Sequence, residues 1–199
     1  MMKPSLLPRL YQITPEPEGP PHFEKFLEQL IATLQSGIEL VQLRAKHLDR
    51  QDHLHVARLA LAQCRHHGAR LMFNGPIEMA LELGCDGVHL NSRTLMSLKD
   101  LSVPEGMLVS AACHSADQLV QASRIGVDFV TLSPVLPTQT HPEAEPLGWE
   151  RFAELVSGAQ IPVFALGGMG PALLENAQRA GAWGIAAISA TWRSGRLEK

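Results

Sequence analysis

Four apolar runs in the chain share one pattern, in which a glycine and one or two linking residues precede a stretch rich in β-forming side chains. They are GIELVQL from Gly37, GCDGVHL from Gly84, GVDFVTL from Gly126 and GAWGIAAIS from Gly181. Further short apolar runs alternate with them, at 10–14, 70–74, 108–114 and 162–168. These lack a clean alternation of apolar and polar positions, which is typical of parallel strands covered on both faces.

The segments between these runs have the apolar spacing of amphipathic helices. We expect one helix after Asp49, a favourable N-cap residue, and before Gly68, because the apolar residues between them fall on one face. A second apolar stripe covers residues 23–34, and Pro171 opens a third helix that stops at Gly181. Strands and helices therefore alternate along the whole chain.

Eight strands alternating with helices indicate an α/β protein, either a closed (β/α)₈ barrel or an open doubly wound sheet. The count of eight favours the barrel. An open dinucleotide-binding sheet would need the pattern G-x-G-x-x-G after the first strand, where this chain has ITPEPEGPP. We therefore predict a single (β/α)₈ TIM barrel that occupies residues 1–199.

Composition narrows the function classes. A chain of 199 residues fits one domain, and a net charge of −3 without a basic run disfavours binding to nucleic acid or a membrane surface. The three cysteines lack C-x-x-C spacing, so we expect buried thiols rather than a disulfide framework or a zinc site. The N-terminus lacks the apolar core of a signal peptide, and no apolar run could span a membrane. We expect a cytoplasmic protein with a small-molecule ligand.

In a barrel the residues that perform chemistry lie at the C-terminal ends of the strands. The second strand ends in QLRAK, where alternation places Gln42, Arg44 and Lys46 on one side. Two cations aimed at one point suit an anion. A solvated charged loop is the alternative, but cations are disfavoured at the start of the helix that would follow.

The last strands and one loop add further anion-binding candidates. Gly167 and Gly168 end the seventh strand and Ser189 the eighth, where barrels commonly bind phosphate through backbone N–H groups. In the loop SPVLPTQTHP, the hydroxyls of Thr138 and Thr140 suit phosphate or pyrophosphate oxygens, with His141 following. Glycines that only end strands and a proline-rich connector are the competing interpretations.

Taken together, a set of motifs resembles the superfamily of thiamine phosphate synthases and thiazole tautomerases, which are (β/α)₈ barrels. The resemblance covers about residues 11–192 and rests on QLRAK, the strand-end asparagine, GCDGVHL, CHS, SPVLPTQTHPEAEPLG, FALGGM and GIAAIS in that order. The synthase joins aminopyrimidine pyrophosphate to thiazole phosphate and expels pyrophosphate. The resemblance thus implies a site for phosphorylated heterocycles.

Site roles follow from the same resemblance. It implies that pyrophosphate is held by Gln42, Arg44, Lys46, Asn74, Thr138 and Thr140, and thiazole phosphate by Gly167, Gly168 and Ser189. His89 matches the histidine of the GVHL motif, and we take His89 and His141 as the candidate catalytic residues. A packed strand histidine is the alternative for His89. We expect neither a cofactor nor a metal.

Departures from the synthase pattern make magnesium-dependent synthase activity doubtful. That pattern has an Asp directly after the strand-end Asn and another a few residues after GVHL, where this chain has Gly75 and Thr94. Neither residue supplies the anionic oxygens that Mg²⁺ prefers. The pattern also has a Lys where this chain has His141 and a strand-five Ser where it has Ala112.

Other branches of the superfamily leave alternatives open. The tautomerase branch resembles the chain in having Asn-Gly at residues 74–75, but its catalytic histidine falls at Pro134, so another histidine such as His89, His114 or His141 would have to replace it. VTLSPVLPTQTHPEAEPLGWERF is most similar to a thiamine-phosphate-synthase-like domain fused behind some Nudix hydrolases. This similarity suggests a non-catalytic domain that partners a Nudix hydrolase, and the sequence also leaves a homodimer open.

Overall fold

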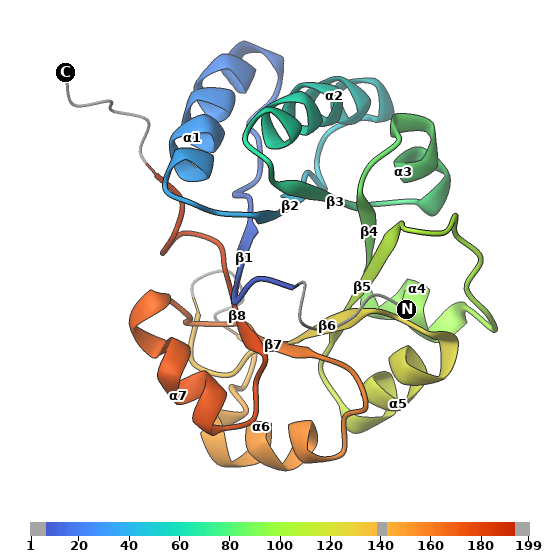
Figure 1. Ribbon diagram of the computed structural model, residues 1–199, viewed down its shortest axis with the longest axis vertical. Coiled ribbons are helices and arrows are strands. Elements are labelled where there is room, and N and C mark those ends of the chain that lie inside the picture. Colours follow the sequence, from blue (N-terminus) through green and yellow to red (C-terminus); the bar gives the residue numbers. More distant parts are fainter. Residues whose placement is uncertain (1–6, 139–142, 194–199) are drawn as a thin grey trace.

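Parallel strands form a closed ring in the order β1 to β8 at the centre of the molecule, with the helices outside it (Figure 1). The structure is a computed structural model that describes residues 7–138 and 143–193. The strands are β1 (Leu10–Ile13), β2 (Leu40–Arg44), β3 (Arg70–Asn74), β4 (Gly87–Leu90), β5 (Leu108–Cys113), β6 (Phe129–Leu132), β7 (Val163–Ala165) and β8 (Gly184–Ala187). The predicted (β/α)₈ barrel is confirmed.

The helices cover the outer surface of the ring. They are α1 (Phe23–Gln35), α2 (Arg50–His66), α3 (Ile77–Leu83), α4 (Ser92–Ser97), α5 (Ala116–Ile125), α6 (Gly148–Ser157) and α7 (Leu174–Arg179). The Asp49 side chain caps α2 by accepting a hydrogen bond from the Asp52 N–H at 2.8 Å. Pro171 opens a 3-10 turn, Pro171–Leu173, before α7 begins. Among the described residues, no helix has the length and apolar character needed to cross a membrane.

The repeated Gly-x-Asp pattern of two expected strand entries has a structural cause. Asp86 precedes β4 and accepts the Leu71 N–H of β3, and Asp128 precedes β6 and accepts the Val109 N–H of β5, each at 2.8 Å. Each carboxylate therefore ties the entry of an even-numbered strand to the strand before it. These contacts help to fix the register of the ring, and hence which side chains face its interior.

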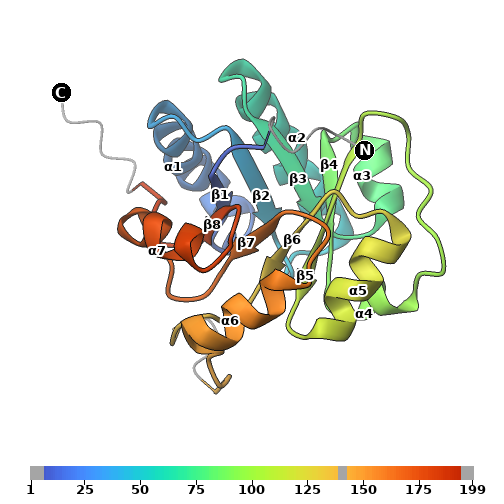
Figure 2. The same cartoon turned by 60° about the horizontal axis from the view of Figure 1, so that its bottom comes forward.

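The barrel interior is apolar at its base and polar at its mouth. The base contains Tyr11, Leu40, Phe129 and Phe164, and the Tyr11 ring lies edge-on to Phe129 with centroids 5.4 Å apart. Along β2 the inward positions change from Leu40 to Gln42 and then Arg44. The base is thus filled by side chains, and the opening lies at the C-terminal end of the strands. Figure 2 shows the ring of strands and the helices around it from an oblique direction.

Candidate functional site

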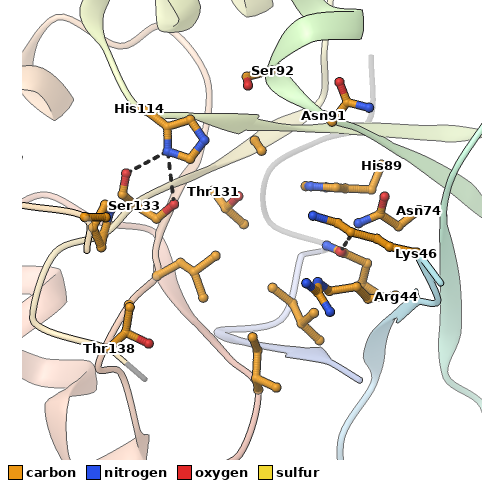
Figure 3. Close-up of a pocket in the computed structure, with 18 residues that line it drawn as sticks. Arg44, Lys46, Asn74, His89, Asn91, Ser92, His114, Thr131, Ser133 and Thr138 are labelled. Carbon is orange, nitrogen blue, oxygen red and sulfur yellow. Dashed lines mark hydrogen bonds between the residues drawn. The ribbon is translucent and has the colours of Figure 1, made fainter. Parts of the chain in front are cut away.

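A cavity of about 430 Å³ lies at the C-terminal mouth of the barrel. Its lining includes polar side chains from β2 to β6 and the segments that follow these strands: Gln42, Arg44, Lys46, Asn74, His89, Asn91, Ser92, His114, Thr131, Ser133 and Thr138. In Figure 3, Arg44, Lys46, Asn74 and His89 lie together on one side, and His114, Thr131 and Ser133 lie across from them. The site therefore has a cationic wall and a hydroxyl-imidazole wall.

The two cations of the cationic wall differ in their ion-pair partners among the described residues. Arg44 Nη1 contacts the Glu16 carboxylate at 2.5 Å, and the other oxygen of Glu16 accepts the His47 backbone N–H at 2.8 Å. Among the described residues, no carboxylate forms an ion pair with Lys46. Burial lowers the pKa of Lys46, the charge of Arg44 lowers it further, and Glu16 opposes both effects. Two cations do converge as the sequence indicates, but Glu16 already partners one of them.

A chain of hydrogen bonds leads from this wall into the barrel. The Asn74 amide donates to Gln42 Oε1 at 2.8 Å, and the Gln42 amide donates to the Tyr11 hydroxyl at 2.9 Å. Burial raises the pKa of Tyr11, although hydrogen bonds with Ser110 and Gln42 act in the opposite sense. Tyr11 therefore stays protonated at neutral pH. The chain holds Gln42 and Asn74 in fixed orientations at the floor of the cavity.

His89 is the deepest histidine of the cavity. It is 5% exposed, and its Nδ1 lies 2.8 Å from the hydroxyl of Ser110. Burial, and then the charge of Lys46, lower the pKa of His89 from 6.5 to about 3. The imidazole is therefore neutral at physiological pH, where it suits a fixed hydrogen-bonding role better than exchange of a proton with a ligand.

His114 has a different environment on the opposite wall. Its Nδ1 lies 2.8 Å from the backbone oxygen of Ser133, and because a carbonyl oxygen only accepts, Nδ1 carries the proton in the neutral ring. The other ring nitrogen, Nε2, points away from Ser133 in Figure 3. The neutral ring thus has a lone pair on Nε2, for which the described residues supply no hydrogen bond, and this is the arrangement a general base requires.

Thr131 supplies a buried hydroxyl beside this histidine. The residue is 1% exposed, and its Oγ1 has no hydrogen-bond partner among the described residues. Buried polar groups in folded proteins are nearly always satisfied, so an exception at a cavity wall needs an explanation. A bound ligand with a polar atom at this point would provide the missing partner.

A second cavity of about 480 Å³ adjoins the first above β7 and β8. Both cavities are lined by Thr138 and Gly167, and the second also by Gly168 and Ser189. The two glycines, with φ of 98° and 66°, follow the end of β7. A Cβ on Gly167 would lie 2.8 Å from Pro134 Cα, and one on Gly168 2.8 Å from Leu136 Cβ. Packing of the loop after β6 therefore requires both glycines, independently of any phosphate.

Backbone donors are nevertheless available in the second cavity. Among the described residues, no acceptor is hydrogen-bonded to the backbone N–H of Gly168 or of Ser189. Free N–H groups beside a serine hydroxyl are the usual components of a phosphate site in this part of a barrel.

Gly75 and Thr94, which stand where the synthase pattern has its two magnesium-binding aspartates, do not form a metal site. A Cβ on Gly75 would lie 2.5 Å from the Phe73 ring, and the Thr94 backbone N–H is bonded to the Asn91 side chain at the start of α4. Thr94 does not line the cavity. No described Asp or Glu lines either cavity, and the described residues hold no cluster of three or more metal-ligating side chains. The donor set therefore does not fit Mg²⁺.

The structure places most of the predicted site residues around the two cavities. These are Gln42, Arg44, Lys46, Asn74, His89, Thr138, Gly167, Gly168 and Ser189, whereas Thr140 and His141 lie outside the described residues. Sequence reasoning missed Glu16 and Thr131. The available signals were weak: Glu16 follows the end of the first strand closely, and Thr131 is the polar residue of an otherwise apolar run.

The fold and the site together define a (β/α)₈ barrel with an anion-suited mouth. The chain belongs to the thiamine monophosphate synthase family, whose model matches residues 10–191. It is 36% identical over 183 residues to "Putative thiamine-phosphate synthase 2" of Aquifex aeolicus, covering 92% of this chain and 97% of that one. A Geobacter sulfurreducens protein with a similar name is 38% identical over 160 residues, covering 79% and 75%.

A solved structure supports the same fold. The thiamine phosphate pyrophosphorylase from Pyrococcus furiosus superposes with a TM-score of 0.74 at 23% identity, covering 96% of this chain and 89% of that one. Identity at this level shows the barrel architecture alone. The family membership rests on the sequence matches.

Proposed function

We propose that the protein binds a phosphorylated heterocycle of thiamine biosynthesis at the barrel mouth, without the carboxylate-held magnesium of the synthase pattern. The observation that carries this proposal is the pair of adjoining cavities, one with Lys46 and the other with free backbone N–H groups. A ring with a phosphate arm needs a shaped hollow for the ring and anion donors for the arm. The two cavities share Thr138 and Gly167, so one ligand can occupy both.

The metal-dependent condensation is not part of the proposal. Departure of pyrophosphate places several negative charges on the leaving group, and Mg²⁺ normally neutralises them. Removal of one comparable electrostatic stabiliser costs about a hundred- to a thousandfold in rate. This chain lacks carboxylates at both positions, and the ring of Phe73 fills the space beside one of them.

Calorimetric titration with thiazole phosphate tests the proposal. Lys46→Met keeps the aliphatic stem and removes the charge, so it should weaken binding by about 10- to 100-fold, the usual value of a charge-assisted hydrogen bond. Lys25→Met is the matched control, because Lys25 is exposed on α1 and lies outside the cavity lining. The proposal is wrong if the parent protein shows no binding at millimolar ligand, or if the two variants bind equally.

Tautomerase-like proton transfer is a second candidate, and the His114 geometry favours it. The Ser133 carbonyl fixes the tautomer of His114 and leaves Nε2 for the cavity. Deuterium exchange at the ring carbon of a thiazole carboxylate phosphate in heavy water, followed by NMR, would detect the activity. His114→Gln should abolish exchange while retaining ligand affinity, and exchange that persists in this variant would exclude His114 as the proton carrier.

The non-catalytic alternative remains a prediction. A Nudix hydrolase partner and a homodimer are both questions of association. Co-migration of the protein with a separately expressed Nudix hydrolase would test the first, and the mass of the protein in solution the second.

A further inference from the structure

Glu16 lies where an anionic ligand of Arg44 would be expected. Its carboxylate contacts Arg44 Nη1 through one oxygen at 2.5 Å and the His47 N–H through the other at 2.8 Å. The side chains of Arg44 and Glu16 are 19% and 22% exposed, so the pair is shielded from water more than a surface ion pair. Pro15 and Pro17 flank Glu16 and restrict the backbone that carries it. The carboxylate is therefore held in place by the fold.

This contact changes the charge that the cavity offers to a ligand. Arg44 and Lys46 both line the cavity, but the carboxylate compensates the charge of Arg44. A ligand anion that binds Arg44 must either displace Glu16 or accept its repulsion. Lys46, without an ion-pair partner among the described residues, remains the available cation. The unliganded site thus presents about one uncompensated positive charge rather than two.

We propose that Glu16 is a specificity-determining residue that makes the site favour a phosphate monoester over a diphosphate. This inference rests on the proposed function and names the charge class of its ligand. A single phosphate group is matched by Lys46 in the first cavity, or by the backbone donors of the second, and does not need Arg44 as a partner. A diphosphate carries a further ionised group, which needs a second cation and meets the Glu16 carboxylate instead. Since the described lining supplies no carboxylate set for a metal, no other group offsets this repulsion.

Glu16→Gln isolates the charge of this side chain. The amide has nearly the same shape, and its oxygen can still accept the His47 N–H, so the fold of the loop is retained. Glu18→Gln is the matched control, because it removes the same charge from the same loop. Glu18 is 72% exposed and its carboxylate lies 3.7 Å from His22 Nε2. Circular dichroism and thermal melting of both variants establish that each is folded.

The two anions to titrate calorimetrically are inorganic pyrophosphate and inorganic phosphate, at low ionic strength with a chelator present. Glu16→Gln should bind pyrophosphate at least about tenfold more tightly than the parent, with a gain of no more than about threefold for phosphate. Glu18→Gln should match the parent for both anions. Equal gains for the two anions, equal behaviour of the two variants, or no pyrophosphate binding by Glu16→Gln would each overturn the inference.

Binding of thiazole phosphate by the parent protein tests the proposed function separately. If the parent binds thiazole phosphate and Glu16→Gln shows no selective gain for pyrophosphate, only the inference about Glu16 is lost. If the parent does not bind thiazole phosphate but Glu16→Gln gains pyrophosphate affinity, the proposed function is lost, and only the discrimination of Glu16 against a diphosphate is retained.

Discussion

Thr131→Val should separate the stability of the barrel from its ability to bind a ligand. Thr131 lies on β6, is 1% exposed and has a hydroxyl without a hydrogen-bond partner among the described residues. Valine has nearly the same shape and replaces that hydroxyl with a methyl group. The substitution therefore removes an unsatisfied polar atom without opening a cavity. If a ligand supplies the missing partner, the same change also removes a ligand contact.

Both effects have calculable sizes. A buried polar group without a partner costs about 1–3 kcal/mol, and we take the lower end because this hydroxyl borders a cavity. The free energy of unfolding should rise by about 1 kcal/mol, which raises Tm by about 2–4 °C in a protein of this size. Loss of one hydrogen bond of about 1 kcal/mol should weaken ligand binding about fivefold. Stability and affinity should thus change in opposite directions.

Chemical denaturation and calorimetric titration with thiazole phosphate measure the two effects. Thr33→Val is the control, because Thr33 is also fully buried but its hydroxyl accepts the Arg193 N–H at 3.0 Å and lies outside both cavities. That variant should lose stability and keep its affinity. The reasoning is refuted if Thr131→Val is no more stable than the parent and binds the ligand equally well.

Two further predictions concern Gly75 and His89. Gly75→Ala should lower the free energy of unfolding by about 1–3 kcal/mol, because its Cβ would lie 2.5 Å from the Phe73 ring. Gly158→Ala should not, because the nearest atom to its Cβ, the Leu155 oxygen, is 4.0 Å away, and equal denaturation midpoints of the two variants would contradict this. The stability of the parent should fall on acidification, because the unfolded chain protonates His89 near pH 6.5 and the folded chain only near pH 3. At pH 5 the free energy of unfolding should be lower by about 2 kcal/mol on account of His89, and His89→Gln should lack this loss. Parallel curves of stability against pH for the two proteins would rule the effect out.

The architecture could be predicted from the sequence because each strand leaves a local signal. A parallel strand covered on both faces is a short apolar run, and a glycine and an aspartate precede the runs of β4 and β6. The Asp86 carboxylate accepts the Leu71 N–H of the neighbouring strand β3, so this pattern marks a strand entry. The apolar runs also mark where the strands end, and the strand ends identify the residues that face the barrel mouth. Alternation alone predicts that Gln42, Arg44 and Lys46 lie on one side, and all three line the first cavity.

The state of those residues could not be predicted, because it depends on partners distant in the chain. The sequence indicates two free cations, yet Arg44 is paired with Glu16, which lies on the loop before α1. His89 and His114 look equivalent as strand-end histidines, and only their surroundings distinguish a buried neutral ring from one with an accessible nitrogen. Thr131 is visible in the sequence only as the polar residue of an apolar strand, and nothing local tells whether its hydroxyl has a partner.

The departures from the synthase pattern concern one property of the site, the amount of negative charge on a ligand that it can neutralise. Absence of carboxylates at positions 75 and 94 removes the means of holding a metal, and Glu16 compensates one of the two cations that could replace it. We expect each change alone to weaken binding of a diphosphate, while the backbone donors of the second cavity are unchanged. A carboxylate at position 75 would also require movement of the Phe73 ring. A carboxylate-held magnesium site would therefore take coordinated changes at several positions, whereas the proposed binding of a phosphate monoester needs none.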